Sequence, residues 1–132
     1  MIQMATPRVL VIEDDDGARS ALESLLVEEG YAVCTAGTGL DGVRRAVEFQ
    51  PHAVVCDFSL PDIDGLEVMR RLRSEFAQLF VIVVTAGRYD PLGERDLRAE
   101  ADVFLDKPVD LTLLRSALTT AVAQAPAPPA LN

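Results

Sequence analysis

Five short apolar runs alternate along this chain with longer segments whose apolar residues recur at helical spacing. Short runs rich in Val and Ile are typical of buried strands, and a spacing of three or four residues is typical of amphipathic helices. The runs predict strands over residues 8–13, 31–36, 53–57, 80–85 and 103–105. Helices are predicted from Ala18 to Gly30, over 40–47, after Gly65, weakly over 91–100, and from Asp110 to Val122.

Strands that alternate with helices predict a parallel sheet covered on both faces, because each helix carries the chain back to the start of the next strand. Right-handed crossovers leave few arrangements, and the flavodoxin-like strand order 2-1-3-4-5 is common among those with five units. We therefore expect an α/β fold with a single doubly wound five-stranded parallel sheet in this order and five helices. The first, third, fourth and fifth strands then lie side by side.

Four of the predicted strands lead into a side chain that can bind a cation or a phosphate. Glu13 and Asp14 come at the end of the first strand, Asp57 ends the third, Thr85 ends the fourth, and Lys107 follows the fifth. Open α/β sheets bind ligands at the carboxyl edge, so we expect these side chains to meet there. Carboxylates suit Mg²⁺, and an ammonium suits a phosphate oxygen. The pattern indicates a site where Asp57 attacks phosphorus.

The length of 132 residues suits one domain rather than two. Hydrophobic residues make up 49 % of the chain, which is enough for a core. We expect a disordered or extended N-terminus over 1–7, a folded domain over 8–124, and a Pro/Ala-rich linker or tail over 125–132. The domain either stands alone or is part of a longer regulator or hybrid kinase.

A formal net charge of −9 argues against direct binding of nucleic acid, whose phosphates require a basic patch. No stretch approaches the roughly 20 apolar residues that a membrane span requires. Met1–Pro7 lacks the cationic start and the apolar stretch of a signal peptide. We therefore expect a cytoplasmic protein without membrane insertion. Cys34 and Cys56 lie within predicted strands and are assigned no chemistry.

Four sequence fragments, in order and with compatible spacing, resemble the receiver domain of two-component response regulators. They are Val-Leu-Val-Ile-Glu-Asp-Asp with Arg19 beyond it, Cys-Asp-Phe-Ser-Leu-Pro-Asp-Ile-Asp-Gly at 56–65, Val-Val-Thr-Ala at 83–86 and Phe-Leu-Asp-Lys-Pro at 104–108. The resemblance covers Arg8 to Val122, so the domain over 8–124 would be a receiver domain. It implies a phospho-aspartate signalling switch rather than an enzyme.

The resemblance also implies a role for each residue of the site. Asp57 would be the phospho-acceptor, Lys107 would pair with the phosphate, and the Lys107–Pro108 peptide bond would be cis. Thr85 would be the switch hydroxyl, and Phe104 the aromatic residue whose ring turns inward on activation. The ligands of Mg²⁺, or of Mn²⁺ in its place, would be Glu13 through water, Asp14, Asp57 and the backbone carbonyl of Ser59.

The implied phosphoryl donor is a sensor histidine kinase or a histidine phosphotransfer protein, while the downstream domain or protein is unknown. Phosphorylation would alter the face formed by the fourth helix, the fifth strand and the fifth helix. One alternative is a receiver-like binding scaffold that works without phosphorylation. Another is an aspartate-nucleophile phosphatase, although such enzymes commonly carry a second Asp where this chain has Ser59.

Overall fold

Five parallel strands form one central sheet in the computed structural model, which describes residues 6–86 and 99–124. The strands are β1 (Arg8–Ile12), β2 (Ala32–Ala36), β3 (Ala53–Asp57), β4 (Phe80–Thr85) and β5 (Val103–Asp106). Their order is β2-β1-β3-β4-β5, and every neighbouring pair is parallel. The predicted doubly wound order is confirmed.

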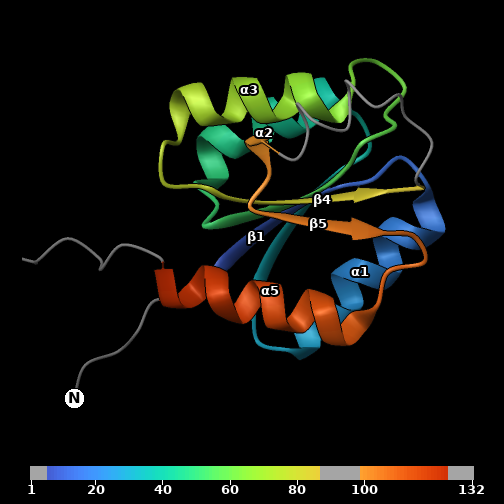
Figure 1. Cartoon of the computed structure of the whole chain (residues 1–132), viewed down its shortest axis with the longest axis vertical. Helices are drawn as coiled ribbons and strands as arrows, with labels where there is room; N and C mark the ends of the chain where they lie inside the picture. The colour runs from blue at the N-terminus through green and yellow to red at the C-terminus, as the bar shows by residue number, and fades with distance from the viewer. Residues whose placement is uncertain (1–5, 87–98, 125–132) are drawn as a thin grey trace, which may run out of the picture.

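Helices cover both faces of this sheet (Figure 1). The described helices are α1 (Asp16–Glu28), α2 (Gly39–Phe49), α3 (Gly65–Glu75) and α5 (Leu111–Gln124). Helices α1 and α5 lie on one face, and α2 and α3 lie on the other. None of the helices in the described ranges is long and apolar enough to cross a membrane. The helix predicted over 91–100 lies outside the described residues except for its last two, and the predicted 125–132 tail lies outside them entirely.

Side chains alternate along each strand, and this alternation divides the core into two layers. In β3, Ala53 and Val55 pack in the layer that includes α1 and α5. Val54 and Cys56 pack in the layer that includes α2 and α3. The next residue, Asp57, therefore falls on the α1 and α5 side at the very end of the strand.

The fully buried residues of helix α2 are small, and of the larger apolar residues over 40–47 that predict it, Val43 packs partly against the core. Leu40 and Val47 are 48 % and 51 % exposed, whereas Gly42 and Ala46 are buried. A Cβ atom at Gly42 would lie 2.4 Å from Cδ1 of Ile12. Strand and helix thus approach too closely for a larger side chain at this point.

Side-chain caps fix where the first and last helices begin. Asp15 accepts a hydrogen bond from the Ala18 N–H at 2.7 Å, and Asp110 accepts one from the Thr112 N–H at 2.9 Å. Asp is among the residues preferred at this position, because its side chain accepts hydrogen bonds from N–H groups of the first turn. Strand β1 ends at Ile12, one residue earlier than predicted, because the chain turns there toward the Asp15 cap. Strand β2 begins one residue later than predicted, and β5 ends one residue later.

Candidate functional site

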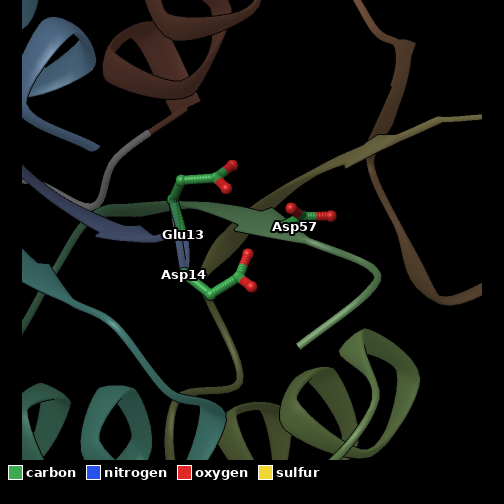
Figure 2. A group of neighbouring side chains, drawn as sticks. All are labelled: Glu13, Asp14 and Asp57. Carbon is green, nitrogen blue, oxygen red and sulfur yellow. The ribbon is translucent and has the colours of Figure 1, made fainter. Parts of the chain in front are cut away.

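The ends of β1 and β3 place three carboxylates side by side (Figure 2). Ile12 pairs with Cys56 across these strands, so the residues that follow them meet at the sheet edge. Carboxylate oxygens of Glu13, Asp14 and Asp57 all lie within 4.8 Å of one another. Glu13 and Asp57 are only 4 % and 5 % exposed, whereas Asp14 is exposed. The sheet thus brings the predicted acidic residues together.

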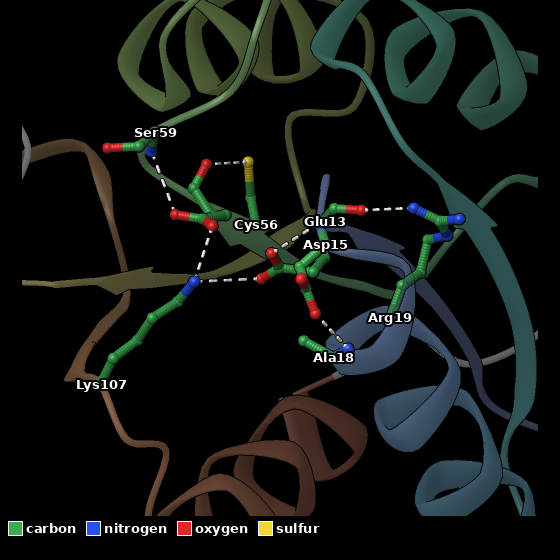
Figure 3. A network of polar contacts seen from close by, with 8 residues as sticks. Glu13, Asp15, Ala18, Arg19, Cys56, Ser59 and Lys107 are labelled. Carbon is green, nitrogen blue, oxygen red and sulfur yellow. Dashed lines mark hydrogen bonds and ion pairs between the residues drawn. The ribbon is translucent and has the colours of Figure 1, made fainter.

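The ammonium of Lys107 lies between the two buried carboxylates. Its Nζ is 2.8 Å from Oδ2 of Asp57 and 3.3 Å from Oε2 of Glu13 (Figure 3). The backbone helps to hold it there, because the Lys107 N–H donates to the Thr85 carbonyl at 2.7 Å. The Lys107–Pro108 peptide bond is cis, as the resemblance implied. The residue that follows β5, Lys107, therefore places its ammonium beside the carboxylates, as predicted.

The cluster has an excess of negative charge, since three carboxylates surround one ammonium. The pKa of Glu13 is raised above its ordinary value, mainly by burial and also by the negative charge of Asp57. The hydrogen bond from the Asp15 amide and the positive charge of Lys107 act in the opposite direction. Burial alone would lower the pKa of Lys107, but its hydrogen bond to Asp57 and the two carboxylate charges raise it. Neutralisation of this excess charge favours the binding of a cation.

The donor atoms of the cluster fit a hard divalent cation. Mg²⁺ prefers oxygen ligands and commonly binds through one or two carboxylates together with several waters. The exposed Asp14 leaves one side of the cluster open to such waters. The buried carboxylates are held by backbone amides: Asp15 N–H donates to Oε1 of Glu13 at 3.2 Å, and Ser59 N–H to Oδ1 of Asp57 at 3.0 Å.

Two further predicted residues, Thr85 and Phe104, come from β4 and β5, and neither lines the cavity beside the charged cluster. Thr85 ends β4 and is 2 % exposed, and Phe104 is half-buried in β5. A cavity of about 280 Å³ opens beside Glu13, Asp57 and Lys107. Its other lining residues are mostly apolar and come largely from α1 and the segment after β5: Ile12, Ala18, Ala21, Leu22, Val55, Val84, Pro108 and Val109. The charged cluster is therefore bordered by an open cavity.

Sequence reasoning missed two contacts that hold the loops of the site. Arg19 Nη1 donates to the Glu13 carbonyl at 2.9 Å. The Asp62 carboxylate accepts from the N–H groups of Gly39 and Leu40, each at 2.8 Å, and so caps α2 from the loop after β3. Arg19 and Asp62 both lie in the fragments that carry the resemblance. Their spacing, however, gives no sign of which backbone groups they contact.

Comparison with curated proteins gives close matches. Residues 9–119 match the family described as the response regulator receiver domain. The chain is 44 % identical over 103 residues to the transcriptional regulatory protein AfsQ1 of Streptomyces coelicolor, covering 78 % of this chain and 45 % of AfsQ1. It is 41 % identical over 106 residues to the response regulator MprA of Mycobacterium sp. strain KMS, covering 79 % and 45 %. The chain spans about half the length of these relatives.

Solved structures share the fold. A CheY-like response regulator receiver domain protein from Methanospirillum hungatei JF-1 matches with a TM-score of 0.82 at 26 % identity, covering 91 % of this chain and 97 % of that one. The response regulator TrrA of Thermotoga maritima, solved in complex with Mg²⁺ and BeF, has a TM-score of 0.78 at 27 % identity, covering 88 % and 99 %. The family match, the strand order and the acidic cluster agree. This chain belongs to the response regulator receiver domain family.

Proposed function

We propose that the chain is a phosphoacceptor switch in which Asp57 takes a phosphoryl group from a sensor histidine kinase or a histidine phosphotransfer protein. The observation that best supports this is the Asp57 carboxylate, 5 % exposed and 2.8 Å from the Lys107 ammonium. An Asp that only capped a turn would not need an ammonium and two further carboxylates beside it. Membership of the receiver family supports the same role.

The proposed transfer forms one bond and breaks one. A carboxylate oxygen of Asp57 attacks phosphorus while the P–N bond to the donor imidazole breaks, and the electron pair of that bond stays on the imidazole nitrogen. The product on Asp57 is a mixed anhydride. Lys107 keeps its proton throughout and pairs with a phosphoryl oxygen. The Ser59 N–H, which donates to Oδ1 of Asp57, orients the carboxylate for attack.

We further propose Mg²⁺, with Mn²⁺ as an alternative, as the cation of this site. Asp14, Asp57 and the backbone carbonyl of Ser59 would be direct ligands, and Glu13 would act through water. A bound divalent cation would neutralise negative charge on the phosphoryl group and on the carboxylates. The support comes from the oxygen donors within 4.8 Å of one another and from the excess of negative charge in the cluster.

The switch is proposed to involve Thr85 and Phe104. The added charge on Asp57 would draw the Thr85 hydroxyl toward the phosphate, and the ring of Phe104 would turn inward behind it. The face affected would be formed by β5, α5 and the helix predicted over 91–100. Such a change has an effect only if a partner binds the two arrangements of this face with different affinity.

The downstream step is also a proposal. AfsQ1 is named a transcriptional regulatory protein, so we propose that the phosphorylated chain controls transcription through a separate domain or partner. The net charge of −9 opposes direct contact of this chain with DNA. The cytoplasmic location remains a prediction.

Incubation of the chain with Mg²⁺ and a small-molecule phosphodonor tests this function. We expect one phosphoryl group per chain, in an adduct that is stable in acid and labile in base, as an acyl phosphate is. Asp57→Ala should abolish labelling, while Glu23→Ala, which removes an exposed carboxylate from α1 outside the acidic cluster, should not. Labelling of Asp57→Ala would refute the assignment. Repeated turnover of phosphate esters would favour the phosphatase, and absence of Mg²⁺ binding would favour the scaffold.

A further inference from the structure

An arginine in the first turns of α1 contacts the loop that carries two of the proposed cation ligands. Arg19 Nη1 donates to the backbone carbonyl of Glu13 at 2.9 Å, and its Nη2 pairs with Asp16 (Figure 3 shows the contact with Glu13). We propose that Arg19 is a positioning residue that holds Glu13 and Asp14 in the geometry needed for Mg²⁺. This inference rests on the proposed function.

The hydrogen bond from Arg19 restrains the backbone at Glu13, directly before Asp14. Each peptide unit is planar, so two torsions per residue set the path of the chain. The unit before Glu13 is held by its N–H, which donates to the Ala36 carbonyl at 3.0 Å. The unit after Glu13 is held by its carbonyl, which accepts from Arg19. Together the two bonds restrain both torsions of Glu13 and hence the direction in which Asp14 leaves the strand.

The loop after β2 leaves space for the guanidinium. A Cβ atom at Gly37 would lie 3.1 Å from Arg19 Nη1, which is closer than ordinary van der Waals contact. Among the glycines in the described ranges, Gly30 has a positive φ and Gly37 does not. An alanine at 37 would therefore act by crowding Arg19 and not by straining its own backbone. Position 37 offers a second way to disturb the same contact.

Two possible roles of Arg19 predict opposite changes in Mg²⁺ affinity when Arg19 is replaced. Arg19 adds positive charge near the proposed cation site, so removing that charge alone should tighten Mg²⁺ binding. If Arg19 instead holds the ligands in place, its removal should weaken Mg²⁺ binding. Groups that orient metal ligands typically contribute about 10–100-fold in affinity. The sign of the change therefore separates the two roles.

Calorimetric titration of the full chain with Mg²⁺ alone, without a phosphodonor, measures this change. Arg19→Gln should weaken binding by about tenfold. Arg19→Lys keeps the charge and one donor, so it should weaken binding less. Gly37→Ala should weaken binding in the same direction, and adding it to Arg19→Gln should cause no further loss, because both act through one contact. The control Arg71→Gln, from the exposed ion pair with Glu67 on α3, should leave the affinity unchanged.

Thermal unfolding in EDTA shows whether the variants simply fold less well. We expect the melting temperatures of Arg19→Gln and Gly37→Ala to stay close to that of the wild type. If both variants bind Mg²⁺ as tightly as the wild type, or more tightly, the inference is wrong while the proposed function stands. If Arg19→Gln loses stability in EDTA and Gly37→Ala retains full affinity, Arg19 serves folding alone. A wild type that neither binds Mg²⁺ nor accepts phosphate at Asp57 would remove the proposed function itself.

Discussion

Replacement of Glu13 by Gln should stabilise the metal-free protein and weaken its response to Mg²⁺. Glu13 is 4 % exposed and carries a charge that burial disfavours. Gln has nearly the same shape and keeps an oxygen that can accept from the Asp15 N–H, which now donates to Oε1 at 3.2 Å. The substitution therefore removes the charge with little change in packing.

The expected gain in the free energy of unfolding is small, because the interactions that favour the Glu13 charge nearly cancel those that disfavour it. At an effective dielectric constant of about 20, repulsion between Glu13 and Asp57, whose oxygens lie within 4.8 Å, amounts to at least about 3.5 kcal/mol, and attraction to Lys107 at 3.3 Å to about 5 kcal/mol. Burial of the ion costs several kcal/mol. The charged hydrogen bond from the Asp15 amide offsets about 1.5–3 kcal/mol of that cost. We expect a net gain of about 1 kcal/mol, which corresponds to about 4 °C for a domain of this size.

The pH dependence follows from the direction of the shift. The folded state raises the pKa of Glu13 above its ordinary value of 4.5, so the folded state binds this proton more tightly than the unfolded state does. Ionisation of Glu13 therefore lowers stability as the pH rises from 4.5 through the raised value. The advantage of Glu13→Gln should be full at pH values above the raised pKa and should vanish once the wild-type residue is protonated in both states.

Thermal unfolding in EDTA and in Mg²⁺ measures both effects. Free Mg²⁺ at 100 times its dissociation constant should stabilise the wild type by about 2.7 kcal/mol, and the variant by less. Glu23→Gln, which removes one exposed charge from α1, controls for net charge and should change little. A Glu13→Gln variant that melts below the wild type in EDTA would show that the ion pair with Lys107 outweighs burial.

Three further outcomes are expected. Gly65→Ala should lower the free energy of unfolding, measured by denaturant titration, by about 1–3 kcal/mol. The new Cβ would lie 2.8 Å from Cα of Phe58, a backbone atom that cannot rotate away. Unchanged stability would contradict this close approach. Lys107→Met should slow labelling of the chain by a phosphodonor by about 100-fold, and an unchanged rate would exclude Lys107 from the transfer. In the native protein, Cys34 should react with iodoacetamide well before Cys56, whose thiol is fully buried and has a pKa raised by that burial; equal native rates would disagree with this packing.

Much of the fold could be predicted because its signals are local. A strand that is buried on both faces has a nearly continuous apolar sequence, as Phe80–Thr85 does. The alternation of strands and helices then restricts the possible topologies. The site followed from the same reasoning. Asp57 comes directly after a buried run, so its position at the carboxyl edge could be inferred once the strand order was assumed.

The rest depends on how segments far apart in the sequence approach each other. The fully buried residues of α2 are small because Gly42 lies against Ile12 of β1, and no pattern within α2 reveals this. The bond from Arg19 to the Glu13 carbonyl depends on how α1 leaves the sheet. Likewise, spacing alone does not show that Lys107 reaches Glu13 as well as Asp57.

A crystal structure of the chain with Mg²⁺ and beryllofluoride, which stands in for the phosphoryl group, is the most direct test of the phosphoacceptor site. We predict beryllium bound to a carboxylate oxygen of Asp57, Mg²⁺ bound by Asp14 and Asp57, and Lys107 Nζ within hydrogen-bonding distance of a fluorine. Beryllofluoride bound to another residue, or Lys107 turned away from it, would contradict the assignment of Asp57 as the phospho-acceptor.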